Sequence, residues 1–178
     1  MDRKLEQKWS LLVKKHGTFA YGKVDQFLTD LEKEYKNKKV KEFHRKGAGY
    51  SSAIVKARQS WVVYVGGRLE NIVRCIVEPV VNRYGAKIVR DKEIQRSRLN
   101  LELDSVRRNL MVHFDRYSYL PDADLIVYRS HKEKERVNIL AILSVKNSFR
   151  ERYTETPYWK LKLGQSPITK GVRVFMVT

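Results

Sequence analysis

The chain has 178 residues, 42% of them hydrophobic, which is enough for one domain with a real core and excludes a disordered basic tail. It has no run of 18 apolar residues and no signal-peptide pattern, which predicts a soluble protein that is not secreted by that route. The single cysteine, Cys75, excludes an internal disulfide, and a cytoplasmic protein is expected. No membrane partner is expected, because no basic amphipathic anchor or lipidation signal stands out. Lysine and arginine total 37 against 20 aspartates and glutamates, a net charge of +17, and this excess favours nucleic acid as a partner over a surface that is basic only for solubility.

Residues 1–47 predict a helical N-terminal arm or subdomain. Two apolar stripes repeat at helical spacing, the first at Leu5, Trp9, Leu12 and Val13 and the second at Val24, Phe27, Leu28 and Leu31. The basic run 36–41 follows the second stripe, between these helices and the next segment. It is either a solvated face or an arm that contacts phosphates.

A second helical block is expected from Tyr50 to Tyr84, interrupted by the pair Gly66 and Gly67. Gly85 is suited to the C-terminal cap of this block, because glycine adopts the left-handed conformation that ends many helices. Pro79 lies inside the pattern and predicts a kink or a break there.

From Ala86 onward the pattern changes to short β-type runs, at 86–89, 110–114, 124–128, 137–145 and 172–177. The charged loop Arg129–Arg136 predicts that the third and fourth runs form an antiparallel pair. The run 137–145 is apolar on both alternating faces almost throughout, which is typical of a central strand covered on both sides. Residues 148–170 look partly helical, so an α/β fold is expected. The chain ends directly after an apolar strand, which leaves a truncated form open.

Two carboxylates, Asp122 and Asp124, stand at the mouth of a buried strand, and Ser144 and Lys146 end its expected neighbour. Because side chains alternate along a strand, Ser144 and Lys146 point to the same face. A lysine at the end of an apolar strand is costly to bury unless it meets a negative charge, and Asp124 is the natural partner.

Acids and a lysine at one strand end suit the hydrolysis of a phosphodiester. Carboxylates bind Mg²⁺ through oxygen, the metal binds the phosphate and activates water, and the lysine stabilises the charge that develops. The alternative is a turn followed by a structural ion pair, and these four residues alone do not decide between the two.

The segment Ser144–Tyr153, with the sequence SVKNSFRERY, and the segment Tyr158–Leu163 resemble the catalytic block of type II restriction endonucleases of the PD-(D/E)XK superfamily. The similarity is greatest to the branch that has serine in the acidic position before the lysine and cuts CCGG-containing sites. Residues 61–84 are also similar to the helix before the core in that branch. The resemblance covers about residues 55–178 and implies a mixed sheet flanked by helices, with a catalytic domain at 48–178 after the helical subdomain at 1–47.

The resemblance implies that Asp124 is the metal-binding aspartate, with Asp122 as a competing candidate, and that Lys146 is the catalytic lysine. Ser144 departs from the usual acid and is a poor ligand for Mg²⁺, so the second acid must come from elsewhere. The candidates are three glutamates, in the order Glu151, Glu70 and Glu155. For Glu151, an exposed carboxylate beside an arginine is an equally good interpretation.

Arg150 and Arg152 follow the active strand, and the arginine fork suits both phosphate oxygens and the guanine edge. Phosphate contact is favoured over base readout, because most protein–DNA hydrogen bonds go to the backbone. A solvated arginine pair is the alternative. Lys160 and Lys162 extend the same basic wall.

The expected function is Mg²⁺-dependent cleavage of double-stranded DNA at a short specific site. A palindromic site calls for two active sites related by two-fold symmetry, so a homodimer is expected. The alternatives are a repair or junction-resolving nuclease on the same fold and a basic nucleic-acid-binding protein without catalysis.

Overall fold

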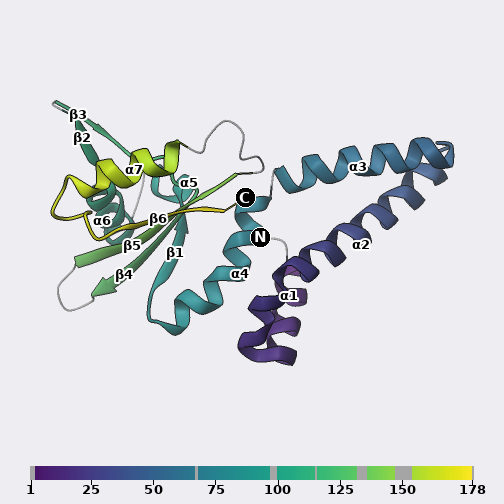
Figure 1. Ribbon diagram of the computed structural model, residues 1–178, viewed down its shortest axis with the longest axis horizontal. Helices are drawn as coiled ribbons and strands as arrows, with labels where there is room; N and C mark the ends of the chain where they lie inside the picture. Colours follow the sequence, from purple (N-terminus) through teal and green to yellow (C-terminus); the bar gives the residue numbers. More distant parts are fainter. Residues whose placement is uncertain are drawn as a thin grey trace. The chain divides into compact units, whose positions relative to one another are not determined.

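A computed structural model shows the architecture of the chain (Figure 1). The residues it describes are 3–66, 68–96, 100–114, 116–131, 136–146 and 154–177. The chain forms two units, Met1–Ile76, called the helical unit below, and Val77–Thr178, called the sheet unit. No helix in these ranges is both long and apolar enough to cross a membrane.

The helical unit contains α1 (Arg3–His16), the 3-10 helix η1 (Gly17–Lys23), α2 (Val24–Arg45), α3 (Tyr50–Gly66) and the first half of α4 (Leu69–Arg83). Its small core surrounds Trp9, which is 1% exposed and packs edge-on against Tyr21 and Phe27 at centroid distances of 5.4 and 5.2 Å. The other buried members are Leu5, Ala20, Ile72 and Cys75. Both predicted helices of residues 1–47 are therefore confirmed.

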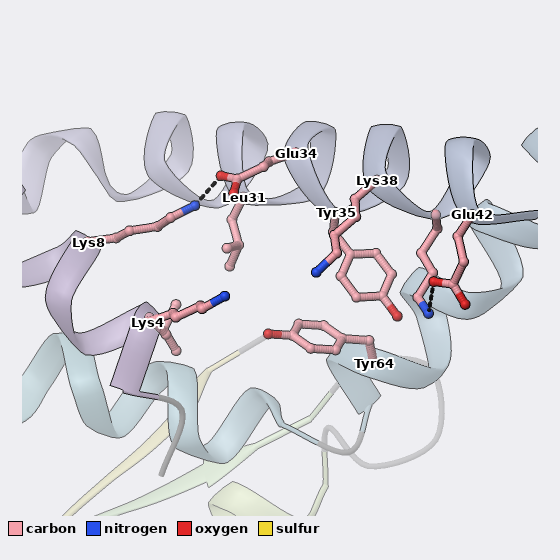
Figure 2. A pocket seen from close by; sticks show the side chains of 10 residues that line it. Lys4, Lys8, Leu31, Glu34, Tyr35, Lys38, Glu42 and Tyr64 are labelled. Atoms are coloured by element: carbon pink, nitrogen blue, oxygen red, sulfur yellow. Dashed lines mark hydrogen bonds and ion pairs between the residues drawn. The ribbon is translucent and has the colours of Figure 1, made fainter.

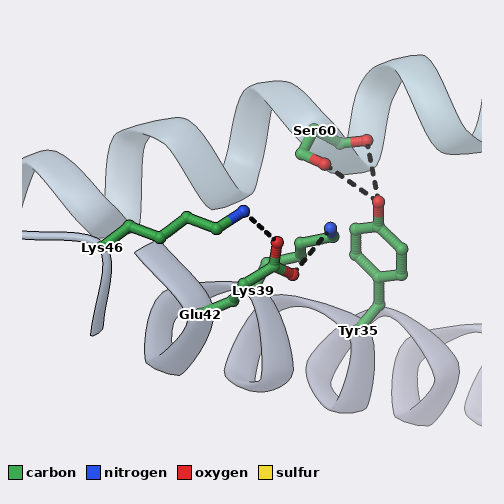
Figure 3. A network of polar contacts seen from close by, with 5 residues as sticks. All are labelled: Tyr35, Lys39, Glu42, Lys46 and Ser60. Carbon is green, nitrogen blue, oxygen red and sulfur yellow. Dashed lines mark hydrogen bonds and ion pairs between the residues drawn. The ribbon is translucent and has the colours of Figure 1, made fainter. Parts of the chain in front are cut away.

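Helices α2 and α3 meet at the turn that joins them and diverge from there (Figure 1), and the contacts between them extend as far as Tyr35 and Tyr64. Ala53 and Ala57 are buried on α3, and such small side chains let two helices approach closely. The Tyr35 hydroxyl lies 2.9 Å from Ser60 Oγ and also donates to the Ser60 carbonyl at 3.4 Å (Figure 3). This pairing joins α3 to the helical unit, which ends at Ile76, whereas the change of sequence texture lies at 47/48.

The basic run 36–41 lies inside α2 and not between helices, contrary to the prediction. Lys36 pairs with Glu32 one turn before it. Lys39 and Lys46 both bind the Glu42 carboxylate, each at 2.9 Å (Figure 3). Glutamates at helical spacing thus stabilise the helix through this run, in which the lysines alone would repel one another.

The sheet unit is built on a four-stranded mixed sheet in the order β1-β4-β5-β6. The strands are β1 (Lys87–Arg90), β4 (Leu125–His131), β5 (Arg136–Val145) and β6 (Arg173–Val177). β1 and β5 both pair antiparallel with β4, and β6 pairs parallel with β5. This confirms both the predicted antiparallel pair and the central position of β5. Both strands of the pair extend into the predicted loop.

Helices cover both faces of this sheet. Three of them, α5 (Asp91–Ile94), α6 (Leu101–Leu110) and α7 (Glu155–Gly164), contribute to the core on one face. Fully buried members of that core are Val106, Leu110, Ile126, Ile142 and Leu163. On the other face, the second half of α4 and the sheet line an open hollow of about 920 Å³. The mixed α/β arrangement is confirmed.

Several local predictions were incomplete. Helix α6 had no predicted counterpart, although Asn100 caps it by accepting a hydrogen bond from the Leu103 N–H at 2.8 Å. Leu110 ends this helix instead of beginning a strand, and the strand that follows, β2 (Val112–Phe114), pairs with an unpredicted strand, β3 (Tyr117–Tyr119).

The ends of α4 give one correction and one confirmation. The helix continues past Pro79 to Arg83, so a break at the proline is wrong. Gly85 has a φ of +65°, which confirms it as the glycine that ends the helical block.

Candidate active site

The pairing of β4 and β5 brings Asp124 and Lys146 to the same edge of the sheet. Leu125 lies opposite Leu143, and the Asp124 N–H donates to the Leu143 carbonyl at 3.0 Å. Lys146 follows β5 directly, and its N–H donates to the Val177 carbonyl of β6 at 2.9 Å. Backbone hydrogen bonds therefore hold both residues that the sequence singled out.

Lys146 Nζ lies 3.3 Å from Asp122 Oδ2 and 3.4 Å from Asp124 Oδ2. The lysine side chain is 11% exposed, against 18% for Asp124 and 50% for Asp122. The Val145 N–H also donates to Asp124 Oδ2, at 2.6 Å. A nearly buried ammonium is thus held between two carboxylates, one fixed by the backbone and one open to solvent.

The pKa of Lys146 is raised above its ordinary value. Burial alone would lower it, but the negative charges of Asp124 and Asp122 and hydrogen bonds to both carboxylates outweigh burial. Lys146 is therefore a cation at neutral pH. In this state it can stabilise negative charge and cannot accept a proton.

Ser144 precedes Lys146 by two positions on the same face of β5. Its side chain is 5% exposed, and its Oγ has no hydrogen-bond partner among the described residues. A buried hydroxyl without a partner costs free energy.

The donor set fits a divalent cation in part. The two carboxylates and one ammonium leave the cluster with a net negative charge, and carboxylate oxygens are ligands that Mg²⁺ prefers. Both contacts of the Asp124 carboxylate are made through Oδ2, so Oδ1 has no protein partner among the described residues. No three acids, histidines or cysteines gather around one point in the described part of the chain. A cation held here would need further ligands from outside this pair.

The three glutamates considered for the second acid fall in three different parts of the chain. Glu155 begins α7 and is half-buried. Glu70 lies in the first turn of α4, in the helical unit. Glu151 falls in the range 147–153, outside the described residues, and so do Arg150 and Arg152.

The two lysines of the expected basic wall both lie on α7 but have contacts within the protein. Lys160 Nζ donates to the Val172 carbonyl at 2.7 Å, which ties α7 to the start of β6. Lys162 lies over the ring of Tyr158, with Nζ 5.8 Å from the ring centroid. Lys160 therefore has a structural contact that the sequence did not indicate.

One residue near the site was missed. The Asp91 N–H, at the start of α5, donates to the Asp124 carbonyl at 3.2 Å and so helps to hold the backbone of the acid. Glu93 accepts from the Arg90 N–H at 2.9 Å, which completes the start of this short helix. A glutamate four residues after the end of the predicted run 86–89, and three after Arg90, was the available signal.

The helical unit has a separate basic feature, a hollow of about 280 Å³ between α1, α2 and α3 (Figure 2). Its lining includes four lysines, Lys4, Lys8, Lys38 and Lys39. Lys8 pairs with Glu34, and Lys39 with Glu42. Lys4 and Lys38 have no ion-pair partner in the part of the chain that the structure describes, which leaves two ammonium groups for an anion.

Comparisons with known proteins agree on one family. The family model described as BsaWI restriction endonuclease type 2 matches residues 102–178. A Helicobacter pylori protein, HpyAORF263P, is 44% identical over 152 residues, or 85% of this chain and 77% of that protein. A Methanocaldococcus jannaschii protein, MjaVIP, is 40% identical over 155 residues, or 87% and 68%. Both carry names that mark them as inferred type II restriction enzymes. No solved structure matches the chain.

Proposed function

Since this chain belongs to the type II restriction endonucleases, we propose that it cuts double-stranded DNA at a short specific site by Mg²⁺-dependent hydrolysis, with Asp124, Asp122 and Lys146 at the scissile phosphate. One observation carries the proposal. Lys146, 11% exposed and protonated, lies within 3.4 Å of both carboxylates at one edge of the sheet. A structural ion pair does not require two acids on one lysine.

Each residue of the cluster has a role in this proposal. Asp124 is oriented by the Val145 N–H and binds the cation through its carboxylate. Asp122, half exposed, is the second oxygen donor. Lys146 stabilises the negative charge that grows on the phosphate oxygens as water attacks phosphorus and the bond to the leaving oxygen breaks. When bound, Mg²⁺ supplies a Lewis acid for the phosphate and lowers the pKa of the attacking water.

The finer assignments belong to the same proposal. The mixed sheet with helices on both faces is consistent with a PD-(D/E)XK fold. Ser144 in the acidic position favours the serine branch that cuts CCGG-containing sites. The acid that would replace this serine as a metal ligand is then one of the three glutamates, with Glu151 first. A palindromic site would be cut by a homodimer.

The test is incubation of the purified chain with plasmid DNA and Mg²⁺, in parallel with EDTA and with Lys146→Ala. We expect discrete bands that disappear with EDTA. The rate of cleavage should fall by about a hundredfold or more with the variant. Lys170→Ala is the matched control, because Lys170 precedes β6 at the opposite end from the site. It should leave cleavage unchanged.

The other outcomes separate the alternatives. A smear that depends on Mg²⁺ and Lys146 would favour a nuclease without sequence selectivity, such as a repair enzyme. Intact DNA with unchanged binding in both forms would overturn the catalytic role given to Lys146.

A further inference from the structure

The hairpin of β2 and β3 forms a two-stranded sheet of its own, separate from the four-stranded sheet. Val112 pairs with Tyr119, His113 with Ser118 and Phe114 with Tyr117. Figure 1 shows this ribbon extending away from the sheet unit, past α6 and α7. The proposed chemistry at Asp124 and Lys146 does not use this ribbon.

The ribbon exposes two large aromatic side chains. Tyr117 is 60% exposed and Tyr119 is 53% exposed, and alternation along β3 puts both on the same side. Their ring centroids lie 6.4 Å apart. A lone two-stranded hairpin is marginal in water, and paired exposed aromatics are typical of a surface that a partner covers. The ribbon is therefore suited to binding.

The base of the ribbon is held by the core. Val112, at the start of β2, is 7% exposed and belongs to the core of the sheet unit. Leu120, directly after β3, packs against the same core, and the next residue, Pro121, is fully buried. With both ends anchored, the ribbon has a fixed direction, as a reading element requires.

The same segment joins the ribbon to the active site. Tyr119 stands five positions before Asp124. At about 3.4 Å per residue, the two Cα atoms are at most roughly 17 Å apart. Since base pairs of B-DNA are stacked about 3.4 Å apart, that distance corresponds to roughly five base pairs. A short recognition site around the scissile phosphate has this size.

The chemistry of the exposed groups suits base edges. Tyrosine hydroxyls donate and accept hydrogen bonds, and their rings offer apolar contact to a thymine methyl group. Arg116, in the turn, is exposed and suits the guanine edge. On the other side of the ribbon, Ser118 Oγ lies 2.8 Å from His113 Nδ1. The major groove, about 12 Å wide, admits a two-stranded ribbon.

We propose that the β2–β3 ribbon enters the major groove of the recognised duplex and reads base pairs beside the cut through Tyr117, Tyr119 and Arg116. The inference rests on the proposed cleavage of duplex DNA and adds its specificity-determining element. It commits to duplex DNA as the partner, because the ribbon is tethered to the residues that would meet the phosphate.

The experiment compares base preferences of the full chain and of two ribbon variants, Tyr117→Ala/Tyr119→Ala and Arg116→Ala. Bound duplexes are selected from a random-sequence pool in EDTA and sequenced, and the same pool is cut with Mg²⁺ and its ends sequenced. Tyr84→Ala is the matched control. Tyr84 is 73% exposed in the same unit, but it precedes β1, at the end of that strand opposite to the one that pairs beside Asp124.

We expect the ribbon variants to lose preference at one or more base pairs within about five of the cut. Cutting of the preferred site should be roughly tenfold slower, within the range for one good base contact. Tyr84→Ala should match the parent. Arg116 is exposed in the turn, so Arg116→Ala remains informative if the double variant does not fold.

Ribbon variants that keep the parent's preference at every position would overturn the inference, and so would a parent that selects no sequence in either arm. Sequence selection that depends on the ribbon, without cleavage, would support the inference while the proposed catalysis fails. Ribbon variants with unchanged sequence selection and normal cleavage would support the proposed catalysis while the inference about the ribbon fails. Protection of adenine N3, in place of guanine N7, from dimethyl sulfate would overturn the assignment to the major groove.

Discussion

The two units have a similar excess of positive charge but use it differently. Residues 1–76 contain 17 lysines and arginines against 8 acids, and residues 77–178 contain 20 against 12. In the helical unit, lysines lie on helix surfaces, and several pair with glutamates one turn away. In the sheet unit, Lys146 is nearly buried between two aspartates.

The difference shows which property carries information about chemistry. Exposed ion pairs on a helix are screened by water and contribute little to stability. The positive charge of the helical unit therefore indicates a polyanionic partner but does not indicate a catalytic site. A buried lysine that meets two acids has lost much of its hydration, and such clusters are common at functional sites. The two units are similar in charge composition, and they differ in whether their charged side chains are buried.

The largest effect expected from the sheet unit is that of Asp124→Asn. We expect cleavage to fall roughly a hundredfold or more, because the cation loses a charged ligand. Folding should suffer less, since an amide oxygen can still accept from the Val145 N–H. Single-turnover cleavage and thermal unfolding measure the two effects. Asp104→Asn, on the surface of α6, is the control, and equal losses in both variants would contradict a special role for Asp124.

The helical unit should respond most to Trp9→Ala. Removing this 1% exposed side chain should lower the free energy of unfolding by about 3–5 kcal/mol. Because the two units have separate cores, hydrogen exchange should show lost protection in α1 and α2 and retained protection in β4 and β5. Ile142→Ala should give the opposite pattern. Equal loss in both units would mean that they unfold together.

The lysine hollow offers a test of whether the helical unit contacts DNA. We expect Lys4→Gln/Lys38→Gln to weaken binding alike for all sequences and to reduce the salt dependence by about two counterions, with the cutting site unchanged. Titration at several salt concentrations measures this. Lys33→Gln/Lys41→Gln changes two exposed lysines on α2 outside the hollow. The same decrease in that control would show that the hollow is not special.

A smaller effect is expected from Ser144→Ala. The hydroxyl has no partner among the described residues, so the free energy of unfolding should be unchanged or rise by up to about 1 kcal/mol. Thr169→Val should instead lose about 1 kcal/mol, because Thr169 Oγ1 donates to the Leu163 carbonyl at 2.7 Å. Cleavage by Ser144→Ala should fall less than tenfold. A hundredfold loss would assign the hydroxyl to the reaction.

The smallest effect concerns the acid tolerance of the helical unit. Hydrogen bonds from Lys46 and Lys39 lower the pKa of Glu42 from about 4.5 to about 2. A lowered pKa gives stability that is present above the unfolded value and is lost as pH falls through the folded value. Glu42→Gln should therefore flatten the loss of helical signal between about pH 4.5 and 2 in circular dichroism. An unchanged profile would mean that this exposed pair contributes nothing.

Much of the fold could be predicted from the sequence because its patterns are local. The stripes around Trp9 and Phe27 predicted two helices, and the doubly apolar run of β5 predicted a central strand. Helix α6 and strand β3 were not predicted. The mixed polar and apolar residues of α6 give weak periodicity, and Tyr117–Tyr119 is too short to show a period.

The sequence by itself determined the residue types of the site and their order, Asp122 and Asp124 before the hairpin and Ser144 and Lys146 after it. It also determined the charge that favours nucleic acid. Only the tertiary structure decided that one lysine meets both acids, that Asp91 and Val145 hold Asp124, and that two exposed tyrosines lie on a separate two-stranded ribbon. These facts depend on strand register and on burial, which arise when distant segments pair and exclude water.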